Sequence, residues 1–311
     1  MQVAVIIPTL NGGDTFFRVL GELRHQSLAP QTVLVIDSGS VDDTVPGALR
    51  AGARVHRIKA GAFNHGATRE LGRRLLKADA YLFMTQDALP AHAHLVENLV
   101  KPLAVRPDIG LAYARQLPRE GASPLEALNR RFNYPADPQL KSRADRGRLG
   151  VKTVFCSNTC AAYRSAALEA VGGFAPVIMC EDQHVAARML EAGYSIYYAA
   201  DALVFHSHDY SLREEFKRGF DLGVFFGSQE RWIVDRFGAA GREGRYLFRE
   251  GRHYLSRTGQ ARLLPQLMGR LLLKWLGYQL GSRESLLPVS LKSRLSLHQN
   301  FWRNSLGQLQ L

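Results

Sequence analysis

The first ninety residues alternate short apolar runs with longer segments. Runs rich in β-branched or apolar residues, typical of buried strands, lie at 3–9, 32–37, 53–58 and 80–85. The segments between them that are long enough for helices lie at 15–26, 42–51 and 66–77. Because strands that alternate with helices form parallel sheets, this pattern predicts an α/β, Rossmann-like fold with a mostly parallel sheet flanked by helices.

Polar side chains gather where the predicted strands end, and in open α/β sheets ligands bind beyond the carboxyl ends of the strands. The candidate residues for a nucleotide site are therefore Pro8, Thr9, Asn11, Asp37, Ser38, Asn64, His65, Arg69, Gln86 and Asp87. Some polar residues here have simpler explanations, since Asp42 or Asp43 can cap a helix and Asp87 can cap one that begins near Ala91. The absence of GxGxxG after the first strand, and of GxxxxGK[ST], disfavours dinucleotide and P-loop sites.

The second half carries two further groups of candidate residues. Residues 181–194 predict a helix with Glu181 and Asp182 in its first turn, where the helix dipole also favours a carboxylate as a cap. The strand-like run 201–205 is followed by His206 and His208, for which metal ligation and a structural role are both open. Amphipathic helices are predicted at 211–230 and 263–281.

Composition narrows the class of protein. A chain of 311 residues that is 46% hydrophobic can bury a sizeable core, and its formal charge of +12 suggests a polyanionic partner such as nucleic acid, an anionic membrane surface or a phosphorylated substrate. No run of about 18 apolar residues and no export signal occurs, so we expect a cytoplasmic protein with reduced cysteines. Cys156, Cys160 and Cys180 are spaced too loosely for a zinc site to be favoured over buried thiols.

Seven motifs then point to a family. They are VIIPTLN, VIDSGSVDDT, GAFNHGATRE, FMTQDA, NTCAAYRSAALEAVGGF, EDQHVAARMLEAGY and VFHSHDYS, in that order over about residues 2–230. This ordered set resembles the family 2 glycosyltransferases of the GT-A fold. Within that family, FNHGATR with TQDA and a basic tail ending in RLSLHQNFW is most similar to bacterial rhamnosyltransferases that use a dTDP-sugar.

The resemblance implies an inverting, metal-dependent glycosyltransferase. Asp87 would stand at the end of the family's Asp-x-Asp signature, where Thr85 and Gln86 replace the other usual residues, and would bind the Mg²⁺ or Mn²⁺ that bridges the donor diphosphate. His206 matches a position at which a histidine completes the metal site in some relatives, with His208 as the alternative.

The same resemblance assigns the donor contacts. Asp37 would recognise the base or ribose, and Thr9 and Asn11 would border the base. Arg69 would reach the diphosphate or the base, since a guanidinium fits phosphate geometry, whereas His65 could equally buttress its own turn.

The resemblance also implies the catalytic and acceptor residues. Asp182 would be the base that removes the proton of the acceptor hydroxyl, and Glu181 would orient the acceptor or the loop. Acceptor contacts are expected from Asn158, Gly172, Gly173 and Phe174. We expect the donor to be dTDP-L-rhamnose, with a UDP- or GDP-sugar as the alternative, and the acceptor to be a bacterial surface glycan, of O-antigen or capsule type, on a lipid diphosphate.

The expected organisation is a GT-A domain at 1–230, with a nucleotide-sugar half at about 1–115 and an acceptor and catalytic half at about 116–230. A basic amphipathic helical region follows at 231–311, where contact with the anionic inner face of the cytoplasmic membrane and core packing both remain open.

A nucleotidyltransferase and a non-catalytic nucleic-acid-binding protein are weaker alternatives, because no cationic phosphate loop and no aromatic-basic motif occurs, and no nucleic-acid partner is expected.

Overall fold

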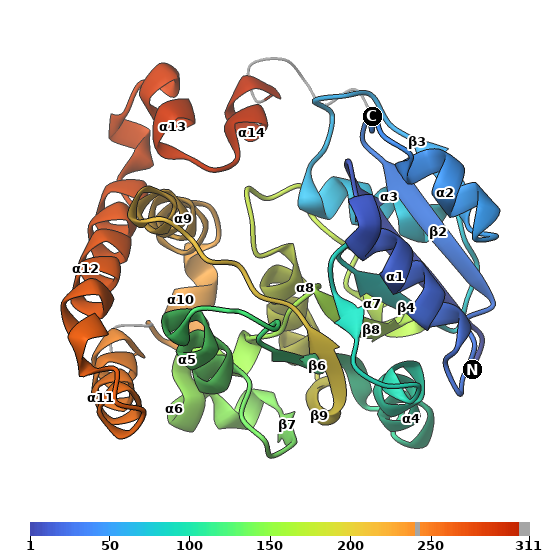
Figure 1. Ribbon diagram of the computed structural model, residues 1–311, viewed down its shortest axis with the longest axis horizontal. Helices are drawn as coiled ribbons and strands as arrows, with labels where there is room; N and C mark the ends of the chain where they lie inside the picture. Colours follow the sequence, from blue (N-terminus) through green and yellow to red (C-terminus); the bar gives the residue numbers. More distant parts are fainter. Residues whose placement is uncertain (240–242, 305–311) are drawn as a thin grey trace.

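A mixed, nine-stranded sheet organises the computed structural model, which describes residues 1–239 and 243–304 (Figure 1). The strand order is β3-β2-β1-β4-β8-β6-β9-β5, and β7 pairs with β9. The strands are β1 (Val3–Thr9), β2 (Thr32–Asp37), β3 (Arg54–Arg57), β4 (Ala80–Met84), β5 (Leu89–Pro90), β6 (Ile109–Leu117), β7 (Gln139–Lys141), β8 (Cys160–Arg164) and β9 (Ser195–Phe205).

The parallel part of the sheet is the part that the alternating pattern predicted. Strand β1 pairs in parallel with β2 and β4, and β2 pairs in parallel with β3. Strand β8 then runs antiparallel between β4 and β6, while β6 and β9 are parallel to each other. The α/β prediction is therefore confirmed, with antiparallel pairing confined to β5, β7 and β8.

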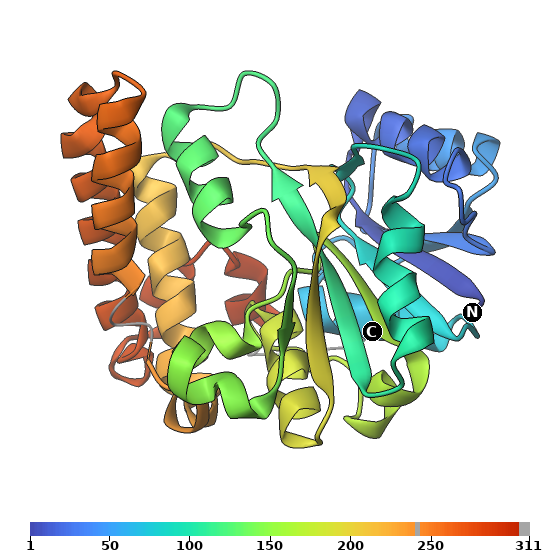
Figure 2. The same cartoon turned by 90° about the horizontal axis from the view of Figure 1, so that it is seen from below.

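Helices cover both faces of this sheet because successive side chains of each strand point to opposite sides. Val3, Val5 and Ile7 of β1 pack toward one core with the helices α1 (Gly13–Arg24), α2 (Thr44–Arg50) and α4 (Leu95–Val105). Ala4 and Ile6 pack toward the other core with α3 (His65–Arg74), α7 (Ser165–Ala170) and α8 (Glu181–Glu191). The two cores fix the orientation of the strand ends that carry the candidate site. Figure 2 shows helices on both sides of the sheet.

The remaining helices stand beside the sheet, away from β1 to β3 (Figure 1). They are α5 (Pro124–Asn133), α6 (Arg146–Leu149), α9 (Leu212–Val224), α10 (Arg231–Phe237), α11 (Glu243–Arg257), α12 (Leu264–Gly281), α13 (Val289–Leu295) and α14 (Gln299–Asn304). The helical C-terminal region is thus confirmed. The helix predicted at 211–230 is α helical to Val224 and continues as a π-helical turn over Phe225–Gln229.

Helices α9 and α12 approach each other at glycines. A Cβ atom at Gly219 would lie 2.2 Å from the carbonyl oxygen of Lys274, and one at Gly277 would lie 2.2 Å from that of Phe216. Gly223 and Gly281 make equally close approaches across the same contact. Side chains at these positions would push the helices apart, so the glycines allow the two backbones to touch.

The C-terminal segment returns to the nucleotide half of the molecule. The backbone N–H of Leu297 donates to Asp221 of α9 at 2.9 Å, and the ring of His298 stands edge-on to His65 at the start of α3, with centroids 5.3 Å apart. The described residues of the region 231–311 therefore pack on both halves of the domain at 1–230 instead of forming a separate appendage. Among the described residues, no helix combines the length and apolarity needed to cross a bilayer.

Candidate active site

The loops after β1 and β2 are held by their own polar side chains. The Asp37 carboxylate is buried and accepts hydrogen bonds from the N–H groups of Gly39 and Ser40, each at 3.2 Å. The hydroxyl of Ser38 donates to the carbonyl oxygen of Thr9, and that of Thr9 to the carbonyl oxygen of Ile7. These contacts hold the strand ends in place, and Gly39 supplies the positive φ of 101° that this turn requires.

Asn11 and Gln86 join the first loop to its neighbours. The Asn11 side chain accepts from the N–H of Val41 at 2.9 Å. The Gln86 amide binds the backbone of Leu10 twice, accepting from its N–H at 2.8 Å and donating to its carbonyl at 3.1 Å. Pro8 is buried within β1. The structure thus places these three predicted donor-site residues at one edge of the sheet, as part of its framework.

The start of α3 assigns different tasks to the three polar residues predicted there. Asn64 caps the helix by accepting from the N–H groups of Gly66 and Ala67, and it donates to the carbonyl of Val177 at 2.9 Å, so its side chain is fully engaged. The guanidinium of Arg69 is buried and pairs with Glu181 at 3.0 Å, and it also donates to the His65 carbonyl. Arg69 therefore ties α3 to α8 in this structure.

Asp87, His206 and His208 form a cluster that could hold a metal ion. One potential ligand atom from each residue lies within 4.8 Å of the others. Within the described ranges 1–239 and 243–304, no other group of three or more His, Cys, Asp or Glu side chains comes together in this way. The Asp87 carboxylate lies 3.6 Å from His206 Nε2 and 3.5 Å from His208 Nε2. It also pairs with Arg119 at 2.7 Å.

The surroundings of the cluster suit ligation. Burial lowers the pKa of His206 to about 3, against the opposing charge of Asp87, and burial likewise lowers the pKa of His208, so both imidazoles are neutral. His206 Nδ1 lies 3.0 Å from the Gln116 amide oxygen, a contact that fixes the ring with Nε2 toward Asp87. One carboxylate and two imidazoles fit a divalent cation such as Mn²⁺.

The alternative role for Asp87 as a helix cap is wrong. After Asp87 the chain forms β5, which pairs with β9, and α4 begins only at Leu95 with His94 as its cap residue. Pro90 belongs to that short strand and does not begin a helix. Pairing with β9 brings Asp87 to the histidines, because both histidines directly follow β9.

Glu181 and Asp182 are adjacent in sequence but differ in environment. Although burial opposes its ionisation, Arg69 and then His65 hold the pKa of Glu181 below its usual value, and Asn158 donates to it at 2.9 Å. Asp182 accepts from the N–H groups of Asn158 at 3.0 Å and of Gln183 at 2.7 Å. Burial and the neighbouring charge of Glu181 raise the pKa of Asp182 to about 7.

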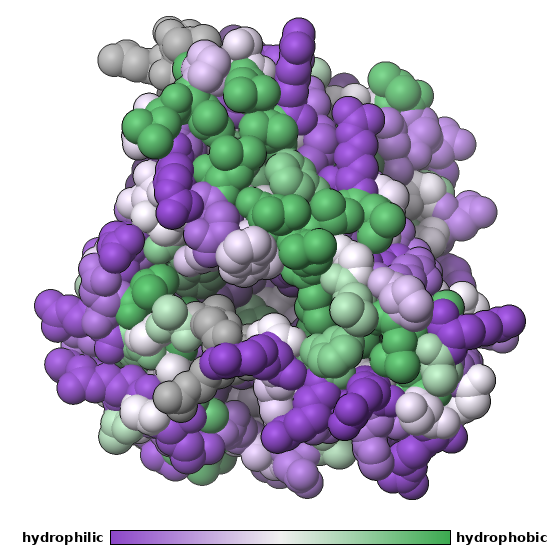
Figure 3. Space-filling model, turned by 90° about the vertical axis from the view of Figure 1, so that its left-hand side faces the viewer, coloured by the Kyte–Doolittle hydropathy of each residue, from purple (hydrophilic) through white to green (hydrophobic). Residues whose placement is uncertain are grey.

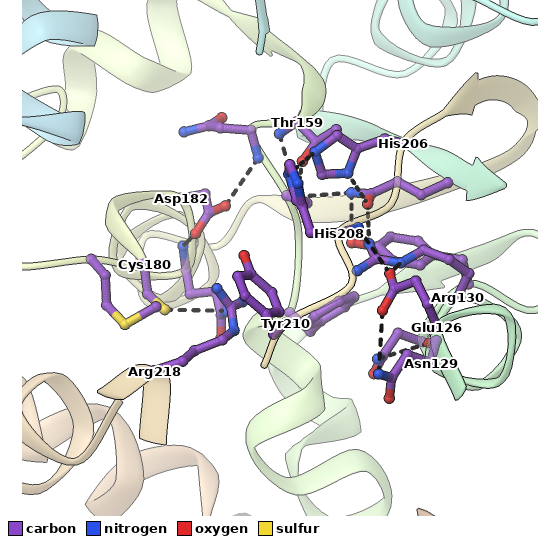
Figure 4. A pocket seen from close by; sticks show the side chains of 18 of the residues that line it. Glu126, Asn129, Arg130, Thr159, Cys180, Asp182, His206, His208, Tyr210 and Arg218 are labelled. Atoms are coloured by element: carbon purple, nitrogen blue, oxygen red, sulfur yellow. Dashed lines mark hydrogen bonds and ion pairs between the residues drawn. The ribbon is translucent and has the colours of Figure 1, made fainter. Parts of the chain in front are cut away.

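The residue before this pair is strained. Cys180 has φ of 58° and ψ of 32°, a left-handed conformation that a residue with a side chain rarely adopts. Such strain costs on the order of 1–3 kcal/mol and persists where the surrounding structure imposes it. The conformation of Cys180 is followed directly by the first residue of α8, Glu181. Asp182, in the first turn of that helix, faces the cavity (Figure 4).

The turn at Gly172, Gly173 and Phe174 lies elsewhere. Phe174 is 4% exposed and packs edge-on against Phe83 and Tyr163, so it belongs to the core. Its N–H donates to Glu70 of α3 at 3.2 Å, and a Cβ at Gly173 would collide with the same carboxylate. These three residues do not line the cavity, which corrects the expectation of an acceptor contact there. Asn158 does line it.

A cavity of about 370 Å³ opens between Asp182 and the two histidines (Figure 4). Its sequence-predicted lining is His65, Arg69, Asn158, Glu181, Asp182, His206 and His208. The other acidic, basic and histidine side chains of its wall were not predicted: Glu126 and Arg130 of α5, Glu215 and Arg218 of α9, Arg270 and Lys274 of α12, and His298 before α14. No local motif marks the six helical residues, because each is one of many charged residues in an ordinary amphipathic helix, and His298 lies within the RLSLHQNFW segment.

The three cysteines take no part in metal clustering among the described residues. Cys156 and Cys160 are buried free thiols whose pKa values burial raises, and Cys180 is the strained residue before Glu181. Cys156 and Cys160 are thus buried thiols, as expected, whereas Cys180 is only partly buried.

The sheet, the carboxylate at the end of β4 and the second carboxylate across the cavity define a GT-A-like transferase fold. Comparison with solved structures supports this: a mannosyltransferase from Pyrobaculum calidifontis, solved with GDP-mannose and Mn²⁺, superposes with a TM-score of 0.62 at 18% identity, covering 89% of this chain and 87% of that one. Residues 1–349 of TarS from S. aureus superpose with a TM-score of 0.52 at 15% identity, covering 92% and 91%.

Sequence comparison identifies the family. The model of the family described as "Glycosyltransferase like family 2" matches residues 1–221, and the chain belongs to this family of glycosyltransferases. It is 40% identical to the O-antigen chain rhamnosyltransferase RfbN of Salmonella typhimurium, covering 98% of this chain and 97% of that protein. It is 37% identical to the O-antigen chain rhamnosyltransferase WbaN of Salmonella anatum, covering 96% and 95%. The predicted glycosyltransferase class is confirmed over the nucleotidyltransferase and nucleic-acid-binding alternatives.

Proposed function

We propose that this glycosyltransferase moves L-rhamnose from dTDP-L-rhamnose to a growing O-antigen-type glycan, with inversion and with the help of a divalent cation. The observation that carries the proposal is one cavity lined both by Asp182, a carboxylate with a raised pKa, and by His206 and His208 of the Asp87 cluster. The two rhamnosyltransferase relatives, which this chain matches along nearly its whole length, support rhamnose as the sugar.

Asp87, His206 and His208 would hold Mg²⁺ or Mn²⁺. When bound, such a cation neutralises the negative charge of the donor diphosphate as it leaves. Asp87 supplies a hard oxygen ligand, which Mg²⁺ also accepts, while the two neutral imidazoles suit Mn²⁺ better. Gln116 orients His206, and Arg119 orients the Asp87 carboxylate.

Asp182 would act as the general base. The acceptor hydroxyl forms a bond to the anomeric carbon as the bond from that carbon to the diphosphate breaks on the opposite face, and the hydroxyl proton passes to Asp182. A pKa of about 7 suits this task, because about half of the base is ionised at neutral pH and the ionised form binds a proton well. Glu181, paired with Arg69 and Asn158, would hold Asp182 and its loop in position.

The donor would lie along the ends of β1, β2 and β4, with its base or ribose near Asp37 and its diphosphate near Asp87. The framework contacts of Thr9, Asn11, Ser38 and Gln86 would shape that edge, with backbone groups making part of the contact. A GDP- or UDP-sugar is the alternative donor, since the mannosyltransferase of the same fold was solved with GDP-mannose.

A membrane-facing surface would bring the enzyme to a lipid-linked acceptor. The outward side of α12 exposes Met268, Leu272, Trp275 and Leu276, each between 41% and 56% exposed. This helix lies on the side of the molecule that Figure 3 shows, where apolar surface is flanked by hydrophilic groups. We propose that this α12 face rests on the inner leaflet of the cytoplasmic membrane, where anionic lipid would complement the net positive charge.

Calorimetric titration tests the donor assignment. The purified protein would be titrated with dTDP, UDP and GDP, each with Mn²⁺ or Mg²⁺ and again with a chelator. We expect metal-dependent binding of dTDP that is lost in Asp87→Ala, followed by rhamnosyl transfer from dTDP-L-rhamnose. Preference for GDP or UDP would reject the sugar assignment, and tight nucleotide binding that ignores the chelator would reject the metal site.

A further inference from the structure

The acceptor side of the cavity contains more positive than negative charge. Five basic side chains, from α3, α5, α9 and α12, line it in the described part of the chain. Three of them are neutralised by carboxylates in the same wall: Arg69 by Glu181 at 3.0 Å, Arg130 by Glu126 at 2.6 Å and Arg270 by Glu215 at 3.4 Å. The two left over are Arg218 and Lys274.

Arg218 and Lys274 have no carboxylate within ion-pair distance among residues 1–239 and 243–304. The Arg218 guanidinium lies over the ring of Tyr210, 5.6 Å from its centre. Burial, and next the positive charge of Arg218, lower the pKa of Lys274, while Glu215, which pairs with Arg270, opposes this from beyond ion-pair distance. Two cations that repel each other in a partly dry cavity are costly, and an anionic ligand between them would remove that cost.

The packing of the two helices holds these cations together. The backbone carbonyl of Lys274 in α12 contacts Gly219 in α9, the residue that follows Arg218. Because the backbones of α9 and α12 are in contact there, neither side chain can move away with its helix. A guanidinium fork beside an ammonium group is a pair that suits phosphate oxygens.

This pair is separate from the cluster around Asp87. The charged groups that act most strongly on Asp87 are His206, His208 and Arg119. Arg218 and Lys274 instead act on Cys180, at the start of the helix that carries Asp182. Figure 4 shows Arg218 on the Cys180 side of the cavity, away from His206. The donor diphosphate, placed at Asp87, would leave this second cationic pair unused.

We propose that Arg218 and Lys274 form an anion subsite that binds the phosphate or diphosphate group through which the acceptor glycan is attached to its carrier. The inference rests on the proposed function, because it takes Asp182 to face the acceptor. A neutral glycan carries no charge to neutralise two cations, whereas a lipid diphosphate does. The opposite side of α12 is the exposed apolar face, so one helix would contact both the lipid surface and the charged group beneath it.

The test uses the full chain in a chelator, so that the metal site is empty, with inorganic pyrophosphate as the calorimetric probe. We expect wild-type protein to bind pyrophosphate, and Arg218→Gln and Lys274→Met each to weaken binding about tenfold or more, which corresponds to about 1.4 kcal/mol. The matched control is Arg213→Gln, which removes an exposed arginine from the same helix and should leave binding unchanged. Melting curves check that both subsite variants remain folded.

Two further arms separate the sources of the anion. Farnesyl diphosphate should displace pyrophosphate and bind more tightly than it if the site serves a lipid diphosphate. Displacement by dTDP in chelator would instead assign the subsite to the donor and overturn the inference, as would equal pyrophosphate binding by wild type and both variants. Metal-dependent dTDP binding is measured on the same proteins. If wild type and both variants bind dTDP but wild type binds no pyrophosphate, the subsite alone is rejected. If wild type binds no dTDP, the proposed donor site is rejected.

Discussion

The two sides of the cavity are built in opposite ways. On the donor side, the loops at the strand ends bind one another's backbone, as Asp37 does with Gly39 and Ser40 and as Gln86 does with Leu10. On the acceptor side, side chains from α3, α5, α8, α9 and α12 converge from positions up to about two hundred residues apart, and two of them, Arg218 and Lys274, have no carboxylate within ion-pair distance in the described ranges. The difference teaches that a rigid edge for a common donor can be built by backbone hydrogen bonds between strand-end loops, whereas a surface specific to one acceptor requires side chains that helix packing brings together.

The largest effect is expected where the acceptor side performs the chemistry. Asp182→Asn removes the proposed base but keeps the shape of the side chain, so kcat should fall by about 10²–10⁴-fold. Metal-dependent dTDP binding, measured by calorimetry, should stay within about twofold of wild type. The control Asp201→Asn removes an exposed carboxylate of β9 and should change neither quantity. Transfer by Asp182→Asn at close to the wild-type rate would remove Asp182 from the mechanism.

The next largest effect is expected at the Asp87 cluster, between the donor and acceptor sides. His208→Ala removes one of the three proposed ligands, and we expect about 10–100-fold weaker metal affinity, read from the Mn²⁺ dependence of dTDP binding. His92→Ala, which removes a half-buried histidine outside the cluster, is the matched control. An unchanged Mn²⁺ dependence in His208→Ala would show that the ligand set excludes this residue.

A methyl group can break the packing on which the acceptor side depends. Gly277→Ala places a Cβ 2.2 Å from the carbonyl oxygen of Phe216, and such overpacking should lower the free energy of unfolding by about 1–3 kcal/mol. Gly269→Ala in the same helix has nothing within 4 Å of the new Cβ, and it should be neutral or stabilising by about 1 kcal/mol. Denaturant unfolding of the two variants measures the difference. Equal stabilities would mean that α9 and α12 are not in backbone contact.

The ionisation of Asp182 predicts a pH profile. Since the base must be ionised, kcat/KM should fall about tenfold per pH unit below its pKa of about 7 and level off above it. A wild-type profile flat down to pH 5 would contradict this.

The same group predicts how stability depends on pH. The folded-state pKa of Asp182 lies above the ordinary 3.8, so the folded state binds this proton more tightly, and stability should decline as pH rises from about 4 to 7. Asp182→Asn should therefore melt higher than wild type at pH 8 and about equally at pH 4.

The smallest effect concerns the outer face of α12. Trp275→Ser with Leu272→Ser should weaken sedimentation with vesicles of anionic phospholipid about tenfold, because both side chains would leave the lipid. Val41→Ser, at an exposed apolar position in the donor half, should have no effect. Catalysis with a water-soluble acceptor should proceed at the wild-type rate in the double variant and in Val41→Ser. Equal vesicle binding by the double variant and wild type would exclude this face as the membrane contact.

Sequence alone determined the elements and the chemistry that depend on neighbours along the chain. The strands at 3–9 and 32–37 were placed to the residue, since apolar runs bounded by turn residues have few other conformations. The carboxylate Asp87 and the pair Glu181 and Asp182 were found from ordered motifs. The helix start near Ala91 was misplaced because pairing of β5 with β9 outweighed the local signal of Pro90.

Tertiary structure alone decided which of these groups are free to act. It paired Arg69 with Glu181, bound Asn64 to the carbonyl of Val177 and buried Phe174. It also brought His208 to Asp87 and left Arg218 and Lys274 without carboxylates. The physical reason is that a charge is neutralised or left unpaired by whatever lies within a few ångströms, and in this fold those neighbours come from distant elements. Local sequence specifies backbone conformation, but only the assembled sheet and helices specify electrostatic environment.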